Sequence, residues 1–280
     1  MRNIVQASWL TEHLQDPNLV VADCRFALGQ PLSGRADYDR EHLPGAVYFD
    51  LDRQLSAPVT EHGGRHPLPD LNAFAAVLSE AGIGPSTTVV AYDDQGGAMA
   101  SRLWWLLRYV GHEQVYLLDG GFSAWKAAGY PVTSEATAPR AASEVYPVQP
   151  QAAMLLRVED IRARLGRPGV TLIDSREAPR YRGEVEPIDA KAGHIPGAKN
   201  RFWKAALDEQ GRWRDAAGQA DRFRDLDPDG EIVVYCGSGV TACPNVLALE
   251  EAGFRNVKLY AGSWSDWISY ADNPIATGDE

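Results

Sequence analysis

The most reactive setting in the sequence surrounds Cys236, which lies within the run EIVVYCGSGVTACPNV at 231–246. The β-branched residues before it predict a buried strand, and Pro244 fits the first turn of a helix that follows. Between them, Gly237 and Gly239 allow a tight turn in which successive backbone N–H groups converge. Such a cradle, at the positive end of a helix dipole, stabilises a thiolate and any anion formed on its sulfur. The pattern predicts a nucleophilic thiol, although an isolated cysteine is more often an inert core residue.

The same loop separates several kinds of cysteine chemistry. A cysteine phosphatase needs an arginine six residues after its nucleophile to grip phosphate, and Ala242 stands at that position. A redox dithiol needs a second thiol nearby, but Cys243 follows seven residues later, almost two helical turns away. The loop therefore disfavours phosphatase and direct disulfide chemistry, and leaves a lone thiol beside an anion cradle.

The sequence repeats itself once. Two motifs, DxR and HxPGA, recur in the same order, and the Cys236 loop has a counterpart in which Asp93 takes the place of the cysteine. The number of residues between matching positions of the two copies decreases from 152 at the HxPGA histidines to 143 at the Asp93 and Cys236 loops. The first half therefore carries extra residues within about 51–70. The matching segments are 20–26 with 171–177, 41–49 with 193–201, 88–100 with 231–243, and 115–125 with 257–267. A carboxylate therefore occupies the nucleophile position of the first half.

Each half predicts a parallel α/β unit, because helix and strand patterns alternate and end in glycine-rich turns. At 280 residues, two domains of ordinary size are expected. Prolines among small and polar residues at 131–152 are typical of a surface linker. The predicted fold class is α/β, with two tandem domains that are each a parallel sheet flanked by helices. The expected boundaries are a first domain at 1–135, a linker at 136–152 and a second domain at 153–280.

Two further positions carry the same residue in both halves, including the half without the cysteine. They are the DxR arginines, Arg25 and Arg176, and the HxPGA histidines, His42 and His194. A feature that both copies keep is more simply structural than catalytic. We therefore expect the arginines to form ion pairs at strand ends and the histidines to brace the Pro-Gly turns.

These marks together resemble the tandem rhodanese family of sulfurtransferases, and the resemblance covers nearly the whole chain. It implies two rhodanese-like domains, of which the first is a catalytically silent copy and the second is catalytic. The loop CGSGVTA at 236–242 is most similar to the 3-mercaptopyruvate sulfurtransferase branch. Thiosulfate-preferring rhodaneses usually carry an arginine and a lysine where this chain has Gly237 and Ser238.

The resemblance implies that Cys236 attacks the sulfur of a donor and keeps it as a persulfide. 3-Mercaptopyruvate is a monoanion with a carbonyl that the Ser238 hydroxyl could polarise, whereas thiosulfate is a dianion that benefits from fixed cations. The prediction is sulfur transfer from 3-mercaptopyruvate to a thiol or cyanide, with thiosulfate transfer and a non-catalytic persulfide carrier as alternatives. The loop residues expected to bind the substrate are Gly237, Gly239, Val240 and Thr241.

Arginines that could hold the donor carboxylate lie in the segment 175–194. In the family an arginine of an RG pair binds the substrate carboxylate, and that match favours Arg182 first and Arg180 second. Animal 3-mercaptopyruvate enzymes carry another arginine just before the HxPG motif, but Ile188 stands near that position. The alternative for either arginine is a solvated surface side chain.

The extra segment of the first half, 49–70, could complete the site. In the mercaptopyruvate members an Asp and a His from the equivalent loop form a triad-like relay with the loop serine. Asp52 and His66 match them by order. An imidazole oriented by a carboxylate would hold or deprotonate the Ser238 hydroxyl. The alternative is that His66 faces solvent, as polar loop histidines commonly do. Another such histidine, His62, lies close to it in the sequence.

Composition limits the partners and the location. A formal net charge of −11 disfavours nucleic-acid binding, so attraction of a small anionic sulfur donor must be local to the arginines. The start of the sequence lacks the apolar core of a signal peptide, no apolar run reaches membrane-spanning length, and three cysteines suit a reducing compartment. These features predict a cytoplasmic enzyme with no metal or other cofactor, and with neither nucleic acid nor membrane as a partner. The expected acceptor is a thioredoxin-like protein or a low-molecular-weight thiol.

Overall fold

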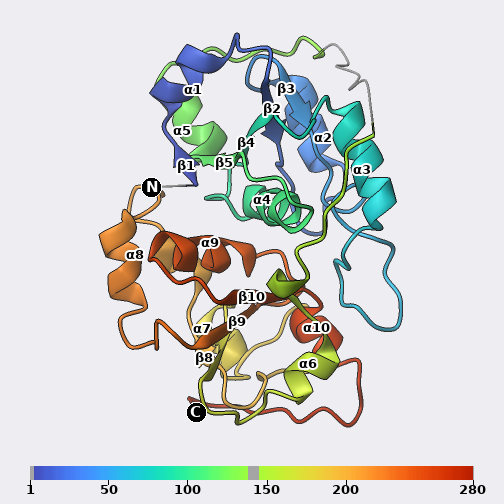
Figure 1. Cartoon of the computed structure of the whole chain (residues 1–280), viewed down its shortest axis with the longest axis vertical. Coiled ribbons are helices and arrows are strands. Elements are labelled where there is room, and N and C mark those ends of the chain that lie inside the picture. The colour runs from blue at the N-terminus through green and yellow to red at the C-terminus, as the bar shows by residue number, and fades with distance from the viewer. Residues whose placement is uncertain (1–2, 138–144, 280) are drawn as a thin grey trace. The chain divides into compact units, whose positions relative to one another are not determined.

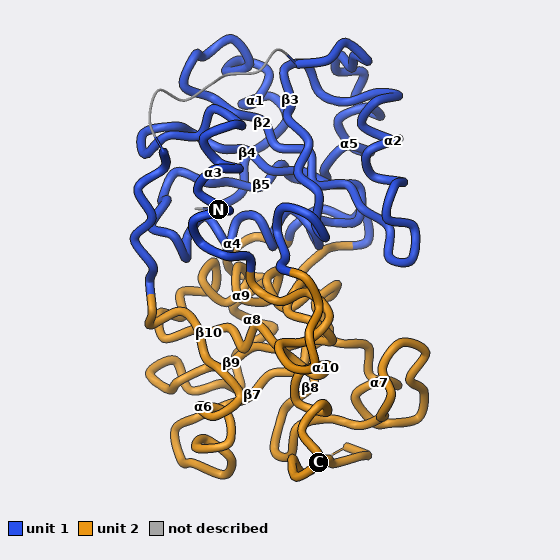
Figure 2. Tube along the Cα trace, turned by 90° about the vertical axis from the view of Figure 1, so that its right-hand side faces the viewer, with its two compact units in different colours: residues 1–57, 69–151, 209–213 blue, residues 58–68, 152–208, 214–280 orange. Residues whose placement is uncertain are grey.

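The computed structural model describes residues 3–137 and 145–279, so the predicted linker at 136–152 lies partly outside the described residues. The chain divides into two compact units, which Figure 2 colours separately. Two short segments belong to the unit opposite to their place in the chain, and the one at 58–68 matters for the site. The first unit comprises 1–57, 69–151 and 209–213, and the second comprises 58–68, 152–208 and 214–280.

The first unit is built on a five-stranded sheet whose neighbouring strands are all parallel (Figure 1). Its strands are β1 (Ile4–Val5), β2 (Leu19–Asp23), β3 (Ala46–Tyr48), β4 (Thr88–Tyr92) and β5 (Val115–Leu118). They lie in the order β1-β5-β4-β2-β3. β-Branched and other apolar residues dominate β2 and β4, as expected of parallel strands that are buried on both faces.

Helices flank this sheet. They are α1 (Ala7–His13), α2 (Ser33–Arg40), α3 (Leu71–Glu80), α4 (Ala100–Tyr109) and α5 (Gly121–Ala127). Leu10 of α1, Tyr38 of α2 and Trp125 of α5 share one core cluster. They pack there with Val21 of β2 and Val90 of β4, so these three helices cover one face of the sheet. α4 packs against β4 and β5.

The second unit repeats this plan with a second parallel sheet. Its strands are β6 (Leu155–Leu156), β7 (Val170–Asp174), β8 (Lys199–Asn200), β9 (Glu231–Tyr235) and β10 (Val257–Tyr260). They lie in the order β6-β10-β9-β7-β8, so β6 to β10 take the places of β1 to β5. The predicted α/β fold with two tandem parallel sheets is therefore confirmed.

The helices of the second unit also correspond to those of the first. They are α6 (Val158–Arg162), α7 (Ala178–Tyr181), α8 (Ala216–Arg222), α9 (Cys243–Glu251) and α10 (Ser263–Trp267), with 3₁₀ helices at Ala152–Met154 and Trp203–Ala206. Ile161 of α6, Tyr181 of α7 and Trp267 of α10 share a core cluster with Val233 of β9. α9 packs against β9, β10 and α8.

In each unit the strand that leads into the repeated loop lies in the middle of the sheet. Asp93 follows β4, and Cys236 follows β9. Loops at the carboxyl ends of central parallel strands are where such sheets present their ligand sites. None of the helices in the described part of the chain is long and apolar enough to cross a membrane.

The DxR motifs form buried ion pairs in both units. Arg25 Nη2 lies 2.6 Å from Asp23 Oδ2, and Arg176 Nη2 lies 2.6 Å from Asp174 Oδ2. Each arginine also donates to the carbonyl of the residue before the HxPGA histidine. The two motifs that the repeat shares are thus joined to each other, as a structural brace requires.

Candidate active site

Cys236 is fully buried at the end of β9. Its Sγ accepts a hydrogen bond from the backbone N–H of Gly239 at 3.2 Å, and its own N–H donates to Ser263 Oγ at 3.1 Å. Gly239 has a φ of 77°, and a Cβ there would collide with the carbonyl oxygen of Ala261. The turn therefore requires glycine at 239, and it holds the cysteine sulfur against a backbone donor.

The rest of the loop continues the turn into α9. Val240 is buried and Thr241 is half-buried, and the carbonyl of Val240 accepts the N–H of Cys243, where α9 begins. Across the loop, Ser263 has a φ of 58°, a left-handed conformation that side chains rarely adopt. This strained residue, whose hydroxyl also donates to Tyr260 O at 2.9 Å, positions the cysteine backbone.

The segment 58–68 brings His66 to the loop within the second unit. His66 Nδ1 lies 2.8 Å from Ser238 Oγ, and both side chains are buried. With its proton on Nε2 the ring accepts the serine O–H, and with its proton on Nδ1 the ring donates to Oγ. The N–H of Gly63 donates to Asp266 Oδ1 at 2.7 Å, which ties the segment to α10. The contact that sequence order predicted between His66 and the loop serine is present.

Asp52 lies in the first unit, in the turn after β3. Its residue is largely exposed, and its N–H donates to Asp50 Oδ1 at 2.9 Å. The burial that it does have raises the pKa of Asp52, and the negative charge of Asp50 adds to that rise. Its role as the carboxylate of the relay stays a prediction.

Three arginines and two carboxylates form a continuous row of ion pairs in the second unit. Arg176 Nη1 lies 3.3 Å from Glu186 Oε2, and Arg180 Nη2 lies 2.7 Å from Glu186 Oε1. Arg180 Nη2 also lies 3.0 Å from Asp189 Oδ2, while the other oxygen of Asp189 pairs with Arg65 Nη1. Both carboxylates are almost completely buried, so water and salt screen these pairs only weakly. Arg65 ends the row.

Two of these guanidinium groups lie beside Gly237, the residue that follows Cys236. A Cβ on Gly237 would lie 2.9 Å from Arg65 Nη2 and 3.7 Å from Arg180 Nη2. Burial lowers the pKa of Arg65, an effect that the negative charge of Cys236 opposes and the positive charge of Arg180 reinforces. Sequence reasoning missed Arg65, although it adjoins the predicted histidine. Two cations therefore lie beside the loop, although its own residues at 237 and 238 are neutral.

The two arginines that the sequence indicated have different surroundings. Arg180 lies beside Gly237, as described above. Arg182 directly follows α7, where its Nε donates to Glu184 Oε1 at 2.7 Å and its Nη1 lies 3.9 Å from Asp279 near the C-terminus. For the role of contacting a ligand beside the Cys236 loop, the geometry therefore favours Arg180, whereas the sequence motif favoured Arg182.

Taken together, these groups suit covalent catalysis on a small anion. A buried thiol beside a backbone donor can act as the nucleophile, the Ser238–His66 pair can stabilise a developing negative charge, and the guanidinium groups can hold a carboxylate. Within residues 3–137 and 145–279, no three His, Cys, Asp or Glu side chains gather in a way that could hold a metal ion.

The chain is similar to known proteins over almost its whole length. A model of the rhodanese-like domain matches residues 6–128 and 157–270. The probable 3-mercaptopyruvate sulfurtransferase of Pseudomonas aeruginosa is 47% identical over 281 residues, which cover 99% of this chain and 98% of that one. The thiosulfate/3-mercaptopyruvate sulfurtransferase 1 of Arabidopsis thaliana is 32% identical over 97% of this chain and 77% of its own. The crystal structure of SseA from Escherichia coli, described as a 3-mercaptopyruvate sulfotransferase, matches with a TM-score of 0.83 at 33% identity, over 95% of this chain and 100% of that one.

Proposed function

The chain belongs to the rhodanese family and is a two-domain sulfurtransferase, and from this premise we propose that it transfers sulfur from 3-mercaptopyruvate to a thiol or cyanide. The observation that carries the choice of donor is the 2.8 Å contact between Ser238 and His66. A hydroxyl held by a buried imidazole suits a donor with a ketone oxygen on which negative charge develops. Thiosulfate has no carbonyl to polarise.

In the first half-reaction Cys236 acts as a thiolate. Its sulfur attacks the donor sulfur, so that an S–S bond forms while the C–S bond of 3-mercaptopyruvate breaks. The electron pair of the C–S bond goes to the enolate of pyruvate, which takes up a proton and leaves as pyruvate. The product on the protein is a Cys236 persulfide, and we expect the backbone N–H groups of 237–241 to hold its outer sulfur.

Ser238 and His66 act on the leaving enolate in this proposal. With its proton on Nδ1, the imidazole donates to Ser238 Oγ and leaves the hydroxyl hydrogen free for the ketone oxygen. Asp52 keeps its predicted role of orienting the imidazole, which then carries a second proton on Nε2 and donates it to the Asp52 carboxylate. Arg180, in preference to Arg182, binds the donor carboxylate, because its guanidinium lies beside Gly237.

The second half-reaction returns the enzyme to its starting state. An acceptor thiolate attacks the outer sulfur, so the acceptor gains a persulfide as the S–S bond to Cys236 breaks, and cyanide in the same role gives thiocyanate. We propose a thioredoxin-like protein or a low-molecular-weight thiol as the acceptor. We also propose the cytoplasm as the compartment, because all three cysteines, Cys24, Cys236 and Cys243, are free thiols that a reducing environment preserves.

Thiosulfate is the competing donor. The guanidinium groups of Arg65 and Arg180 supply positive charge beside Gly237. Positive charge attracts either donor, and the thiosulfate dianion more strongly. Discrimination in favour of 3-mercaptopyruvate must therefore come from the Ser238 hydroxyl acting on the ketone.

Steady-state kinetics with both donors, measured side by side on the purified protein, test this proposal. We expect kcat/KM for 3-mercaptopyruvate to exceed that for thiosulfate by roughly tenfold or more, since a transition-state contact of a few kcal/mol serves only the ketone. Mass spectrometry after incubation with donor should find one added sulfur on the Cys236 peptide, removable by cyanide. A preference for thiosulfate would reject the donor assignment, and an adduct that forms without turnover would favour a persulfide carrier.

A further inference from the structure

We infer that Arg65 is the second guanidinium of the donor-carboxylate site, an assignment that rests on the proposed function. Its Nη1 pairs with Asp189 and its Nη2 borders Gly237, while its Nε has no hydrogen-bond partner among the described residues. Its side chain is 27% exposed, against 13% for Arg180 and 1% for Arg176. Of the three arginines in the row, Arg65 is therefore the most accessible to a ligand.

Asp189 holds Arg65 and Arg180 next to each other. It divides its two oxygens between them, one to Arg65 Nη1 and one to Arg180 Nη2, and it is itself almost completely buried. A carboxylate also has two oxygens, and it forms its strongest contacts with planar guanidinium groups that donate in pairs. Two guanidinium groups fixed beside Gly237 thus form a receptor for a carboxylate near the nucleophile.

Arg65 shares its counter-charge with Arg180, whereas Arg176 at the other end of the row also pairs with a buried carboxylate, Asp174. Within the described part of the chain the ion-pair partner of Arg65, Asp189, is shared with Arg180, and Glu186 is in turn shared between Arg180 and Arg176. Burial lowers the pKa of Arg65, as expected of a cation that has lost water without gaining a carboxylate of its own. A donor carboxylate would add a negative charge next to Arg65 in a poorly solvated place, where an ion pair is strong.

The backbone that carries Arg65 is clamped in place. The N–H of Arg65 donates to Ser265 Oγ at 3.1 Å. Gly64 has a φ of 81°, and a Cβ there would collide with the carbonyl oxygen of Gly262, so the segment passes close to the start of α10. His62 stacks on a tyrosine just after α10, with ring centroids 4.0 Å apart. A side chain on a segment held in this way can position a ligand.

The residue at position 188 suggests why a guanidinium from another segment would be needed at this site. Ile188 is 42% exposed and offers nothing to a carboxylate, near the position where animal 3-mercaptopyruvate enzymes carry an arginine. Arg65 pairs with the very next residue, Asp189, from a segment 124 positions earlier in the chain. A guanidinium therefore reaches the same part of the site from another segment, which motif matching around 188 does not detect.

The test compares donors with and without a carboxylate. 3-Mercaptopyruvate and 1-mercaptopropan-2-one share the thiol and the ketone, and only the former has a carboxylate. We would measure the second-order rate constant of persulfide formation in a single turnover for the wild type, Arg65→Gln and a matched control, Arg224→Gln, whose arginine is 78% exposed on the surface. We expect Arg65→Gln to slow the reaction of 3-mercaptopyruvate by roughly 10- to 100-fold and that of the neutral ketone by about twofold at most.

Equal losses with both donors would overturn the inference, because a merely structural role of Arg65 affects both. A carboxylate-selective loss in Arg182→Gln that is absent from Arg65→Gln would overturn it as well. If Arg65→Gln does not fold, Arg65→Lys keeps the charge without the planar fork and should show a smaller loss with the same donor selectivity. Failure of the proposed function is distinguishable, since the wild type would then form no persulfide from 3-mercaptopyruvate.

Discussion

The loop after β4 and the loop after β9 occupy the same place in two copies of one fold, yet the acceptors of their backbone N–H groups differ. In the second unit the sulfur of Cys236 accepts one such hydrogen bond, from Gly239 at 3.2 Å. In the first unit the carboxylate of Asp93 fills the turn, and its four hydrogen bonds of 2.7–2.9 Å come from the N–H groups of Gln95, Gly97, Met99 and Ala100. One loop is therefore filled by its own anion, whereas the other can receive an anion made on its cysteine.

This difference gives two physical reasons for the silence that we propose for the first unit. A carboxylate is a poor nucleophile toward sulfur, and Asp93 has its oxygens engaged by backbone donors. Burial raises the pKa of Asp93 while those hydrogen bonds oppose the rise. The same backbone turn can thus hold either a carboxylate or a thiol, and the residue that follows the strand, Asp93 or Cys236, sets which of them it holds.

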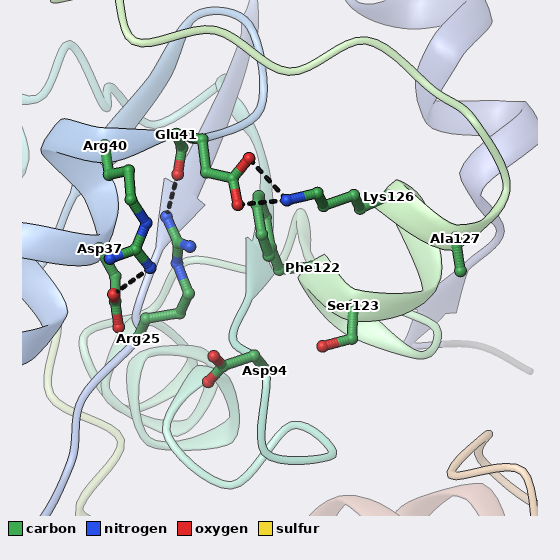
Figure 3. Close-up of a pocket in the computed structure, with 9 residues that line it drawn as sticks. All are labelled: Arg25, Asp37, Arg40, Glu41, Asp94, Phe122, Ser123, Lys126 and Ala127. Carbon is green, nitrogen blue, oxygen red and sulfur yellow. Dashed lines mark hydrogen bonds and ion pairs between the residues drawn. The ribbon is translucent and has the colours of Figure 1, made fainter.

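The surroundings of the two loops differ as well. Figure 3 shows a cavity of the first unit lined by Arg25 and Asp94, which are the repeat partners of Arg176 and Gly237. Two of the three cations that line this cavity pair with carboxylates that also line it. Arg40 Nη2 lies 2.5 Å from Asp37 Oδ1, Lys126 Nζ lies 2.5 Å from Glu41 Oε1, and the Arg25 guanidinium stacks on Phe122.

In the second unit the corresponding charges extend to the segment 58–68, which belongs to this unit although residues of the first unit flank it in the sequence. The ion-pair row ends at Arg65, which lies in the segment 58–68. The same segment supplies His66 to Ser238. Catalytic competence therefore requires more than the exchange of an aspartate for a cysteine, because the neighbouring charges and the Ser–His pair also have to be supplied.

The largest expected effect comes from giving the second unit the residue of the first, Cys236→Asp. The carboxylate should settle into the turn as Asp93 does, and it removes the nucleophile, so sulfur transfer should fall by roughly 10⁴-fold or more while the protein stays folded. The loss is measured as the rate of sulfur transfer from the donor, and circular dichroism checks that the variant is folded.

The matched control is Cys24→Ser, at another buried thiol that directly follows a strand. Burial, followed by the charges of Asp23 and Asp93, raises the pKa of the Cys24 thiol well above its usual value, so this thiol stays protonated and inert. We expect the control to keep its activity. If Cys24→Ser were inactive while Cys236→Asp stayed active, the assignment of the nucleophile would have to be abandoned.

The next largest effect is on stability, from emptying the turn of the first unit. Asp93→Ala removes the acceptor of four backbone N–H groups in a buried place, so the free energy of unfolding of that unit should fall by about 3–5 kcal/mol. Asp93→Asn is the matched control, because it keeps one oxygen acceptor and should lose less. Denaturant unfolding followed by tryptophan fluorescence measures both. Equal stability of wild type and Asp93→Ala would show that the filled turn contributes nothing to the first unit.

Much of the fold was predictable because its signals are local and occur twice. The apolar strand before Cys236, the glycine-rich turn and the proline-led helix after it all form as expected, and so do their counterparts around Asp93. The repeat then predicts two sheets of one topology. The exchanged segment 58–68 was not predictable, because its place depends on contacts with α10 about 200 residues later, such as Gly63 with Asp266.

The placement of Cys236 at the end of a strand was predictable, because the strand and the glycine-rich turn around it are local signals. The candidate site was not predictable where position decides. Arg180 and Arg182 are two residues apart at the end of the short helix α7, so they cannot face the same side, and the motif does not reveal which of them faces the loop. Arg65 was missed because its partner Asp189 is distant in the chain, and no local pattern marks such a pair.

The smallest of the three effects concerns Ser238, at the position where the first unit has Gln95. Ser238→Ala removes the hydroxyl that pairs with His66 and leaves the rest of the loop in place. We expect kcat/KM to fall roughly tenfold for 3-mercaptopyruvate and by about twofold or less for thiosulfate, because only the ketone gains a hydrogen bond in the transition state. If the two residues act as one unit, Ser238→Ala combined with His66→Asn should lose little more than either change alone. Additive losses, or equal losses with both donors, would instead mean that the contact only supports the loop and that donor choice depends on the arginines.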